Sequence, residues 1–305
     1  MPVLVLAAIR TPLGALGGAL RPLSAVHLGA LAIREALIRA ALPGAAVDEV
    51  VMGCAFQAGM GPNPARQAAL KAGLAPQTPA WTLNQLCGSG LMAVAQAARS
   101  LEAGHGRLAV AGGLESHSNA PYLLPQARWG KRMGATELRD SLLEDGPAWF
   151  EDLALDDPPV PGSPPSPASL VPVAVPGRKG LTIVDQDEWS PPQQGRASAG
   201  HAPPADGAAA LVLASESAAG GGSPLGRILG FSTAASGAVH HLAAQAGVPT
   251  GEIHTFMAAD HLLAVGGAPL LVDMLHSLRS EGRRYGLAAL ATGDGQNLAL
   301  LLELC

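Results

Sequence analysis

The feature that most restricts the fold of this chain is the alternation of short apolar runs with helical patterns between residues 3 and 111. Residues 3–9 are continuously apolar, which is typical of a strand covered on both faces. Residues 24–41 carry an amphipathic helical pattern that Ser24 is suited to cap. The alternation continues with strand signals at 50–52, 82–84 and 107–111 and helix signals at 63–72 and 87–102. This order predicts an α/β fold in which parallel strands have helices on both faces.

The composition fits a closely packed α/β protein and argues against several other classes. Apolar residues make up 48% of the 305 and aromatic residues only 3%, so Ala, Val and Leu must build the core. The net charge of −5 gives no electrostatic case for nucleic-acid binding. No apolar run approaches the roughly 18 residues that suggest a membrane helix. The three cysteines are widely spaced and odd in number, which argues against a disulfide scaffold and a structural zinc site. We therefore expect a cytoplasmic protein.

One cysteine stands where a predicted strand ends and a predicted helix begins, in the segment Asn84-Gln85-Leu86-Cys87-Gly88-Ser89-Gly90-Leu91. The unpaired amides and the positive end of a helix lower the pKa of a thiol and favour the nucleophilic thiolate. Gly88 and Gly90 leave room for a substrate close to the backbone. Free cysteine is more often a small buried hydrophobe, and we assign that role to the two other cysteines. At Cys87 the surrounding residues favour a nucleophile.

Several blocks of this sequence, in a fixed order, resemble the N-terminal half of a thiolase. They are Gly61–Ala69, Asn84–Gly90, Ala111–Ser116, Asn119–Leu124 and Arg128–Gly130. Further blocks that fit the same family are Arg10–Gly14, Val171–Val173, Arg178–Gly180 with Val184-Asp185, and Asp206–Ala210. Ordered blocks are far more specific than any one motif, and the resemblance covers most of the chain.

The resemblance implies a thiolase-like five-layer αβαβα fold made of two similar mixed-sheet halves. Residues 1–118 and 203–231 would form the N-terminal half, and 232–305 a truncated C-terminal half with two helices and one or two strands. Residues 119–202 would form a shortened loop excursion. Six prolines between 158 and 167 make part of that excursion an extended linker.

The resemblance also implies a chemistry. Thiolases transfer an acyl group from coenzyme A to a cysteine and then perform Claisen condensation, or thiolysis in reverse. The motif match assigns Cys87 as the acylated residue, with the amides of Cys87 and Gly293 holding the acyl oxygen. No bound cofactor and no metal are implied, and a coenzyme A thioester is the possible substrate. The expected assembly is a homodimer, a dimer of dimers or a heteromer with a related subunit.

The C-terminal half departs from the family pattern at the second cysteine, which acts in thiolases as an acid and base. The surroundings of that position match within Gly286–Asn297, but the position itself holds Ala291. Alanine cannot move a proton, so no evident group generates the carbanion of the second substrate. Asp294, beside Gly293, would place a negative charge near a developing oxyanion.

One short stretch, Ile253–Gly267, stands for two family blocks. Aligned backwards from Leu270–Leu278, His261 falls on the catalytic histidine of the family, although its neighbours differ. Aligned forwards from residues 247–249, the same histidine ends an altered Asn-Glu-Ala block and the histidine block is deleted. The two registers exclude each other, so His261 is either catalytic or a structural histidine.

The region that contacts coenzyme A in the family is altered as well. The Ala-Gly-Asn-Ala-Ser block of the family reads Ala199–Pro203 here, which keeps Gly200 and loses the Asn and the Ser. Arg178 and Lys179 could meet phosphates of coenzyme A, or they could be solvated surface charges. Affinity for coenzyme A is expected to be weakened or absent.

Three functions remain open on these residues. In the first, the chain is a thiolase-like acyltransferase that keeps the Cys87 half-reaction while condensation and thiolysis are impaired. In the second, it is a non-catalytic, thiolase-derived binding or scaffold subunit that pairs with a paralogue or another partner. Full thiolase activity ranks last, because it requires His261 and a substitute for the missing cysteine.

Overall fold

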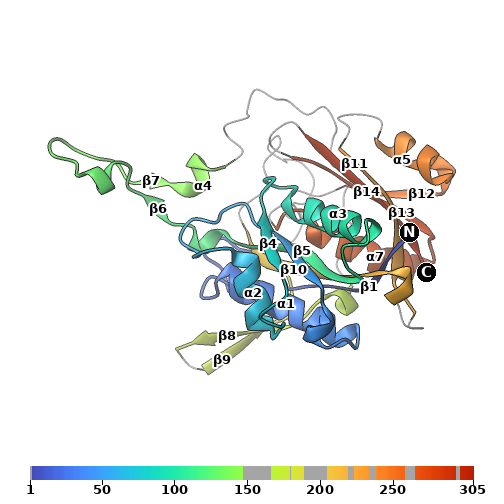
Figure 1. The fold of residues 1–305 in the computed structure, drawn as a ribbon. Helices are drawn as coiled ribbons and strands as arrows, with labels where there is room; N and C mark the ends of the chain where they lie inside the picture. The colour runs from blue at the N-terminus through green and yellow to red at the C-terminus, as the bar shows by residue number, and fades with distance from the viewer. Residues whose placement is uncertain are drawn as a thin grey trace.

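Strands from both ends of the chain form one continuous mixed sheet (Figure 1). The computed structural model describes residues 2–146, 166–178, 180–188, 205–218, 223–233, 238–257, 265–292 and 296–305. The strands follow the order β12 (Ile253–Met257), β13 (Tyr285–Ala291), β14 (Asn297–Leu304), β11 (Gly226–Ser232), β1 (Val3–Arg10), β10 (Ala205–Ser215), β5 (Leu108–Ser116), β3 (Glu49–Gly53) and β4 (Ala80–Leu83). The two-residue β2 (Gly14–Ala15) pairs with β10.

The first half of this sheet contains both parallel and antiparallel pairs. Strand β3 pairs parallel with β4 and β5, as the alternation of strands and helices predicts. Strand β10 lies between β5 and β1 and is antiparallel to both. All 11 residues of β10 are buried, as expected for a central strand with helices on both faces. The result is a mixed sheet, as the family resemblance implies.

The chain after Ser232 forms three described strands, so the expectation of one or two is wrong. Strand β12 is a five-residue edge strand in which His254 and Thr255 interrupt the apolar pattern, and the sequence signal is correspondingly weak. It pairs parallel with β13, whereas β14 is antiparallel to β13 and β11. Strand β11 also pairs with β1 and so joins the two halves. The limits proposed for the two halves stay a prediction.

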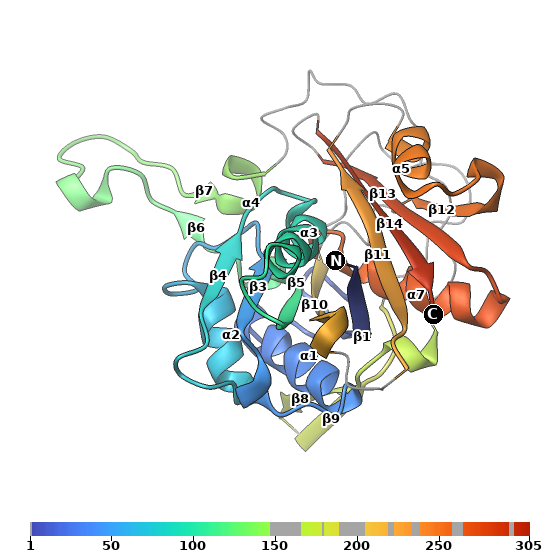
Figure 2. The ribbon, with the colours of Figure 1, turned by 45° about the vertical axis from the view of Figure 1, so that its right-hand side comes forward.

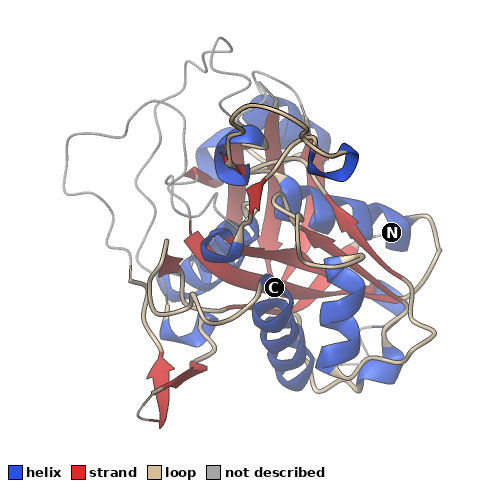
Figure 3. Cartoon of the chain, turned by 90° about the vertical axis from the view of Figure 1, so that its left-hand side faces the viewer, coloured by secondary structure: helices blue, strands red, loops and turns tan. Residues whose placement is uncertain are grey.

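Five layers of helices and strands confirm the expected αβαβα architecture (Figures 2 and 3). Helices α1 (Ala25–Arg39) and α2 (Pro64–Ala72) cover one face of the first half. Helices α3 (Ser89–Glu102) and α7 (Ala268–Glu281) form the central layer, in one core with strands of both halves. Helix α5 (Ala238–Ala246) covers the outer face of the second half, where Leu242 packs with Leu301.

The start of α1 follows the expected capping chemistry, and the start of α2 has a side-chain cap that we did not predict. The Ser24 side chain accepts a hydrogen bond from the His27 amide at the start of α1. The Asn63 side chain accepts one from the Arg66 amide at the start of α2, and Pro64 occupies the first turn. Both helices were predicted within two residues of their observed limits.

The predicted excursion carries two hairpins on its described residues. Strands β6 (Tyr122–Leu123) and β7 (Arg139–Asp140) lie in an arm that projects from the body and leads to helix α4 (Ser141–Glu144) (Figure 1). Strands β8 (Val173–Gly177) and β9 (Gly180–Val184) pack against the layer of α1 and α2. Most of the proline-rich stretch lies outside the described residues. Short 3-10 turns occur at Gly44–Ala46, His117–Asn119, Ala127–Trp129, Pro167–Ser169, Glu216–Ala218 and Thr250–Glu252.

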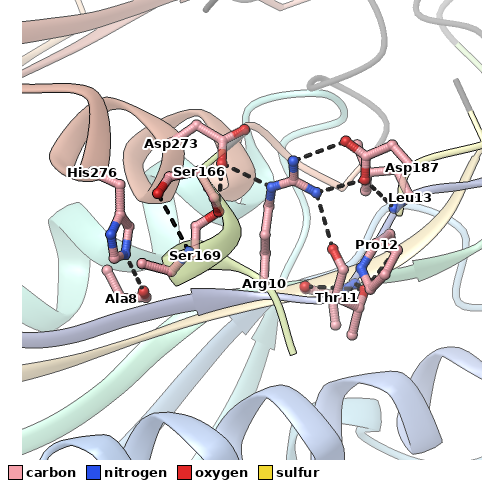
Figure 4. A network of polar contacts seen from close by, with 12 residues as sticks. Ala8, Arg10, Thr11, Pro12, Leu13, Ser166, Ser169, Asp187, Asp273 and His276 are labelled. Carbon is pink, nitrogen blue, oxygen red and sulfur yellow. Dashed lines mark hydrogen bonds and ion pairs between the residues drawn. The ribbon is translucent and has the colours of Figure 1, made fainter. Parts of the chain in front are cut away.

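A fully buried arginine at the end of β1 joins three segments that are distant in sequence (Figure 4). The Arg10 guanidinium donates to both carboxylate oxygens of Asp187, at 2.8 and 2.9 Å, and to Asp273 of α7 at 2.9 Å. Asp187 also accepts from the Leu13 amide, and Asp273 accepts from the Ser169 hydroxyl. This network fixes the returning end of the excursion between β1 and α7.

Within the described residues, none of the helices combines the length and the apolar character needed to cross a membrane.

Candidate active site around Cys87

Cys87 lies in the tight turn between β4 and α3, beside the carboxyl ends of the parallel strands β3, β4 and β5. It is partly buried and packs against the central core. Leu86, directly before it, has a φ of 47°, a left-handed conformation that is unusual for a non-glycine residue. The amides of Gly88 and Ser89 donate to the carbonyls of Gln85 and Leu86, which closes the turn.

The Ser89 side chain stabilises this turn by two hydrogen bonds on its buried side. Its fully buried hydroxyl accepts from the Gln85 amide at 2.8 Å and donates to the Leu86 carbonyl at 2.6 Å. Both bonds end on the residues that precede Cys87. The side chain of Ser89 therefore holds the backbone of the turn on the side away from solvent.

The helix begins two residues later than the sequence predicts. We expected Cys87 to open α3 and to face unpaired amides, but α3 begins at Ser89 with Gly88 as its N-cap. The amides of Gly88 and Ser89 are used within the turn, and the Leu91 amide donates to the Gly266 carbonyl at 2.9 Å. Three of the first amides thus have protein acceptors, because the turn and the start of α7 supply carbonyls. The set of unpaired amides that we expected to face Cys87 is therefore smaller than the sequence predicts.

The start of α7 lies directly against the Cys87 turn. A Cβ on Gly266 would be 2.4 Å from the Gly90 nitrogen, and one on Gly267 would be 3.5 Å from the Cys87 carbonyl oxygen. Both glycines have positive φ values. At Gly266 only glycine satisfies both the left-handed backbone and the close approach, and at Gly267 the left-handed backbone favours glycine.

Gly53 of β3 lies directly against the backbone of Ser89 and Gly90 at the start of α3. This close packing predicts a loss of stability when a side chain is added. A Cβ there would be 2.3 Å from the Ser89 carbonyl carbon and 2.4 Å from the Gly90 nitrogen. We expect Gly53→Ala to lower the free energy of unfolding by about 1–3 kcal/mol, since backbone atoms must move. Urea unfolding measures this. Gly251→Ala is the control, because no atom lies within 4 Å of its Cβ, and an equal loss in both variants would contradict the prediction.

The loop after β13 meets the Cys87 turn from the other half. A Cβ on Gly88 would lie 2.4 Å from Leu298 Cδ1 and 2.6 Å from Thr292 Cγ2. The amide and hydroxyl of Thr292 both donate to the Gln296 carbonyl, which brings the ends of this loop together. The Gln85 side-chain amide donates to the Gln296 side chain at 2.8 Å. Thr292 and Gln296, which stand on either side of the residues where we expect an oxyanion amide, are therefore neighbours of the Cys87 turn.

Only some of the predicted site residues are among the residues that the structure describes. Cys87 is described, whereas His261, Gly293, Gly200 and Lys179 lie outside the described residues. The backbone of Ala291 ends β13, next to Thr292. Arg178 is exposed in the turn between β8 and β9, a hairpin that packs on the outer helix layer, whereas Cys87 belongs to the central layer. The structure does not bring Arg178 and Cys87 together within one chain, and the role of Arg178 stays a prediction.

A buried acidic residue beside the site was missed by the sequence reasoning. Glu115, at the end of β5, accepts from the amides of Ala55 and Phe56 and from the Cys54 thiol. Burial raises the pKa of the Glu115 carboxyl, and burial and then the Glu115 charge raise the pKa of the Cys54 thiol. Cys54 is therefore held as a protonated thiol, in agreement with the expected role of a buried hydrophobe. We expected the same role for Cys305, and there the expectation is wrong, because Cys305 is exposed at the end of the last strand. Glu115 is part of a block that we used only for the family resemblance.

The raised pKa of Glu115 predicts a pH dependence of stability. The folded state holds its proton above the unfolded value of 4.5, so this group stabilises the fold below that pH and the contribution is lost as pH rises through the folded pKa. We expect Glu115→Gln to remove this decline. Urea unfolding of both proteins from about pH 4 upwards tests it. Parallel stability curves for the two proteins would contradict it.

Among the described residues, no three side chains of His, Cys, Asp or Glu gather in a way that could hold a metal ion. The described side chains that contact the Cys87 turn are neutral and polar or apolar, as with Gln85, Thr292 and Leu298.

Comparisons with known proteins give consistent results. The family model "Thiolase, N-terminal domain" matches residues 3–152. An acetyl-CoA acetyltransferase of Escherichia coli (strain K12) is 33% identical over 389 residues, covering 98% of this chain and 98% of that protein. One of Cupriavidus necator is 49% identical over 144 residues, 47% of this chain and 37% of that protein. The crystal structure of the Bacillus anthracis acetyl-CoA acetyltransferase matches 100% of this chain and 99% of that chain with a TM-score of 0.83 and 25% identity.

The alignment with the Escherichia coli protein also shows that this chain is the shorter of the two. Its 389 aligned positions exceed the 305 residues of this chain by 84, so at least 84 positions are gaps in this chain. This chain is thus shorter than that relative within the matched region.

Proposed function

The chain belongs to the thiolase family, and from this premise we propose that it is an acyltransferase in which Cys87 takes an acyl group from a coenzyme A thioester. The observation that carries the proposal is the fixed turn around Cys87, where β4, α3, α7 and the loop after β13 meet. The printed names of its relatives, acetyl-CoA acetyltransferases, make a short acyl chain the first candidate.

The acylation step is a thioester exchange. The Cys87 thiolate attacks the acyl carbonyl and forms a carbon–sulfur bond. The bond from that carbon to the sulfur of coenzyme A then breaks, and the coenzyme leaves as a thiolate that takes a proton from solvent. The amide of Cys87, with that of Gly293, is proposed to stabilise the oxygen of the tetrahedral intermediate.

We further propose that condensation and thiolysis are impaired. Ala291 stands where the family pattern has its acid/base cysteine, and it ends the strand that leads into the loop beside Gly88. Among the described residues next to this turn, Gln85, Thr292 and Gln296 carry amides and a hydroxyl, which are poor proton carriers near neutral pH. The acyl group would pass to water, which releases a carboxylic acid and restores the thiol, or to another acceptor.

Mass spectrometry after incubation with acetyl-CoA tests the acyl-enzyme directly. We expect an acetyl group on the peptide that contains Cys87 and release of one coenzyme A per adduct formed. The adduct should disappear on treatment with hydroxylamine, which cleaves thioesters. A folded protein that forms no adduct with any short acyl-CoA would overturn the proposal.

The replacement at Ala291 also favours a second candidate, a non-catalytic binding or scaffold subunit. The two candidates differ in what Ala291→Cys should do. We expect this variant to gain thiolysis of acetoacetyl-CoA if the other groups that thiolysis needs are intact. No gain, together with no acetyl adduct on the unmodified chain, would favour the scaffold subunit.

Assembly and location remain proposals as well. We propose a homodimer or a dimer of dimers, with a heteromer as the alternative, in the cytoplasm. Sedimentation analysis of the purified chain alone separates these states, because a chain that requires a related subunit would stay monomeric.

A further inference from the structure

The Asn84 side chain connects the turn that contains Cys87 to the turn after β3 by a hydrogen bond. Asn84 Nδ2 donates to the Ala55 carbonyl at 3.0 Å, and Asn84 Oδ1 accepts from the Leu86 amide at 3.0 Å. One amide side chain therefore connects the turn after β3 to the residue that precedes Cys87.

Glu115 holds the turn after β3, which contains Ala55 and Phe56. The carboxylate accepts from the Ala55 amide at 2.8 Å and from the Phe56 amide at 3.3 Å, and only 2% of its surface is exposed. The Phe56 ring packs edge-on against His117 at 4.9 Å, which holds the same turn from its other side. Glu115, the backbone of Ala55 and Asn84 thus form a continuous set of contacts that ends at Leu86.

Leu86 is the residue whose backbone needs this support. A left-handed conformation is unfavourable for a non-glycine residue and persists only where its surroundings impose it. Here the Leu86 amide is held by Asn84, and its carbonyl accepts from both the amide and the hydroxyl of Ser89. Release of either side would let Leu86 relax towards the common negative-φ region and would redirect Cys87.

We propose that Asn84 and Glu115 are positioning residues for the Cys87 nucleophile, acting through the left-handed Leu86. The proposal rests on the proposed function for its biological meaning. Its physical content is that these two side chains set the orientation and the reactivity of one thiol. Asn84 makes the direct contact, and Glu115 acts one step further away through the Ala55 backbone.

Alkylation of Cys87 by iodoacetamide as a function of pH tests the proposal without any coenzyme A. The background is Cys305→Ser, because Cys305 is exposed and Cys54 is buried. We expect Asn84→Ala to slow alkylation of Cys87 at neutral pH by about three- to tenfold, the range that the net loss of a hydrogen bond gives. The apparent pKa of the alkylation should also shift. Glu115→Gln should change the alkylation rate and the apparent pKa in the same direction as Asn84→Ala, but by a smaller amount.

Three further variants separate positioning from loss of stability. Asn119→Ala is the matched control, since its side-chain amide also donates to backbone carbonyls, those of Arg21 and Leu23, but does not reach the Cys87 turn. It should leave the pH profile unchanged. Leu86→Gly removes the steric penalty of positive φ, so adding it to Asn84→Ala should recover at least half of the lost rate. If Asn84→Ala does not fold, Asn84→Asp keeps an acceptor for the Leu86 amide and loses the bond to Ala55.

The outcomes are distinct from those for acyl transfer. An unchanged pH profile in folded Asn84→Ala or Asn84→Asp overturns the positioning role, even where the unmodified protein forms an acetyl adduct. A slowed and shifted profile that Leu86→Gly rescues supports it, even where no adduct forms and the proposed function fails. A loss of rate equal to that of Asn119→Ala overturns it as well.

Discussion

Replacement of Cys87 by serine is expected to lower acyl transfer from acetyl-CoA by roughly 10³-fold or more, because removal of a covalent nucleophile costs at least this much in comparable enzymes. Serine has nearly the same shape, but its hydroxyl stays protonated at neutral pH and no described neighbour of the turn is a strong base. The acetyl adduct on the Cys87 peptide should disappear as well. The rate of coenzyme A release, followed with a thiol reagent after separation from protein, measures the effect.

The matched control for this prediction is Cys305→Ser. Cys305 is exposed at the end of the chain. Partial desolvation and then the Glu303 charge raise the pKa of its thiol, although the Arg227 charge opposes the rise. Its replacement should leave the release of coenzyme A within about twofold, as is usual for surface substitutions away from a site. If Cys87→Ser retained the release rate and Cys305→Ser lost it, the assignment of the nucleophile would be wrong.

The parts of the fold that the sequence predicts are those with local causes. The apolar run at 3–9 became β1, Ser24 caps the helix that it precedes, and the glycine-flanked Cys87 lies at a junction of strand and helix. Each of these features is encoded within a few residues, by periodicity or by capping chemistry.

The parts that the sequence does not predict depend on contacts between distant segments. Asn84 lies 29 residues from Ala55, to which it donates, and Glu115 lies 60 residues from the same residue. No local pattern marks either pair. The two-residue error at the start of α3 has the same origin, because the left-handed Leu86 is imposed by those contacts and by the Ser89 hydroxyl. A turn imposed by tertiary contacts was read as the first turn of a helix.

Arg10→Met is the substitution with the largest expected effect on stability. Methionine fills much of the same volume, but Asp187 and Asp273 would lose their shared cation while remaining largely buried. Breaking a buried pair in this way costs about 3–5 kcal/mol of unfolding free energy, mainly because uncompensated charge is left inside. Urea unfolding at pH 7 measures it. Arg139→Met is the control, since the Arg139–Glu144 pair is exposed and should contribute less than about 1 kcal/mol.

The pH dependence of the Arg10→Met variant separates orphaned charge from lost packing. In the unmodified protein burial raises the pKa of Asp273 and Arg10 opposes that rise, so removal of Arg10 leaves burial and the Asp187 charge to raise it further. A folded pKa above the unfolded 3.8 stabilises the fold at low pH, and this contribution is lost as pH rises. The variant should therefore be closest to the unmodified protein near pH 4 and furthest from it at pH 7. Adding Asp187→Asn and Asp273→Asn should recover part of the loss at pH 7, because the buried charges are then gone. A deficit that is constant with pH and not reduced by these amides would show that Arg10 stabilises the protein by packing alone.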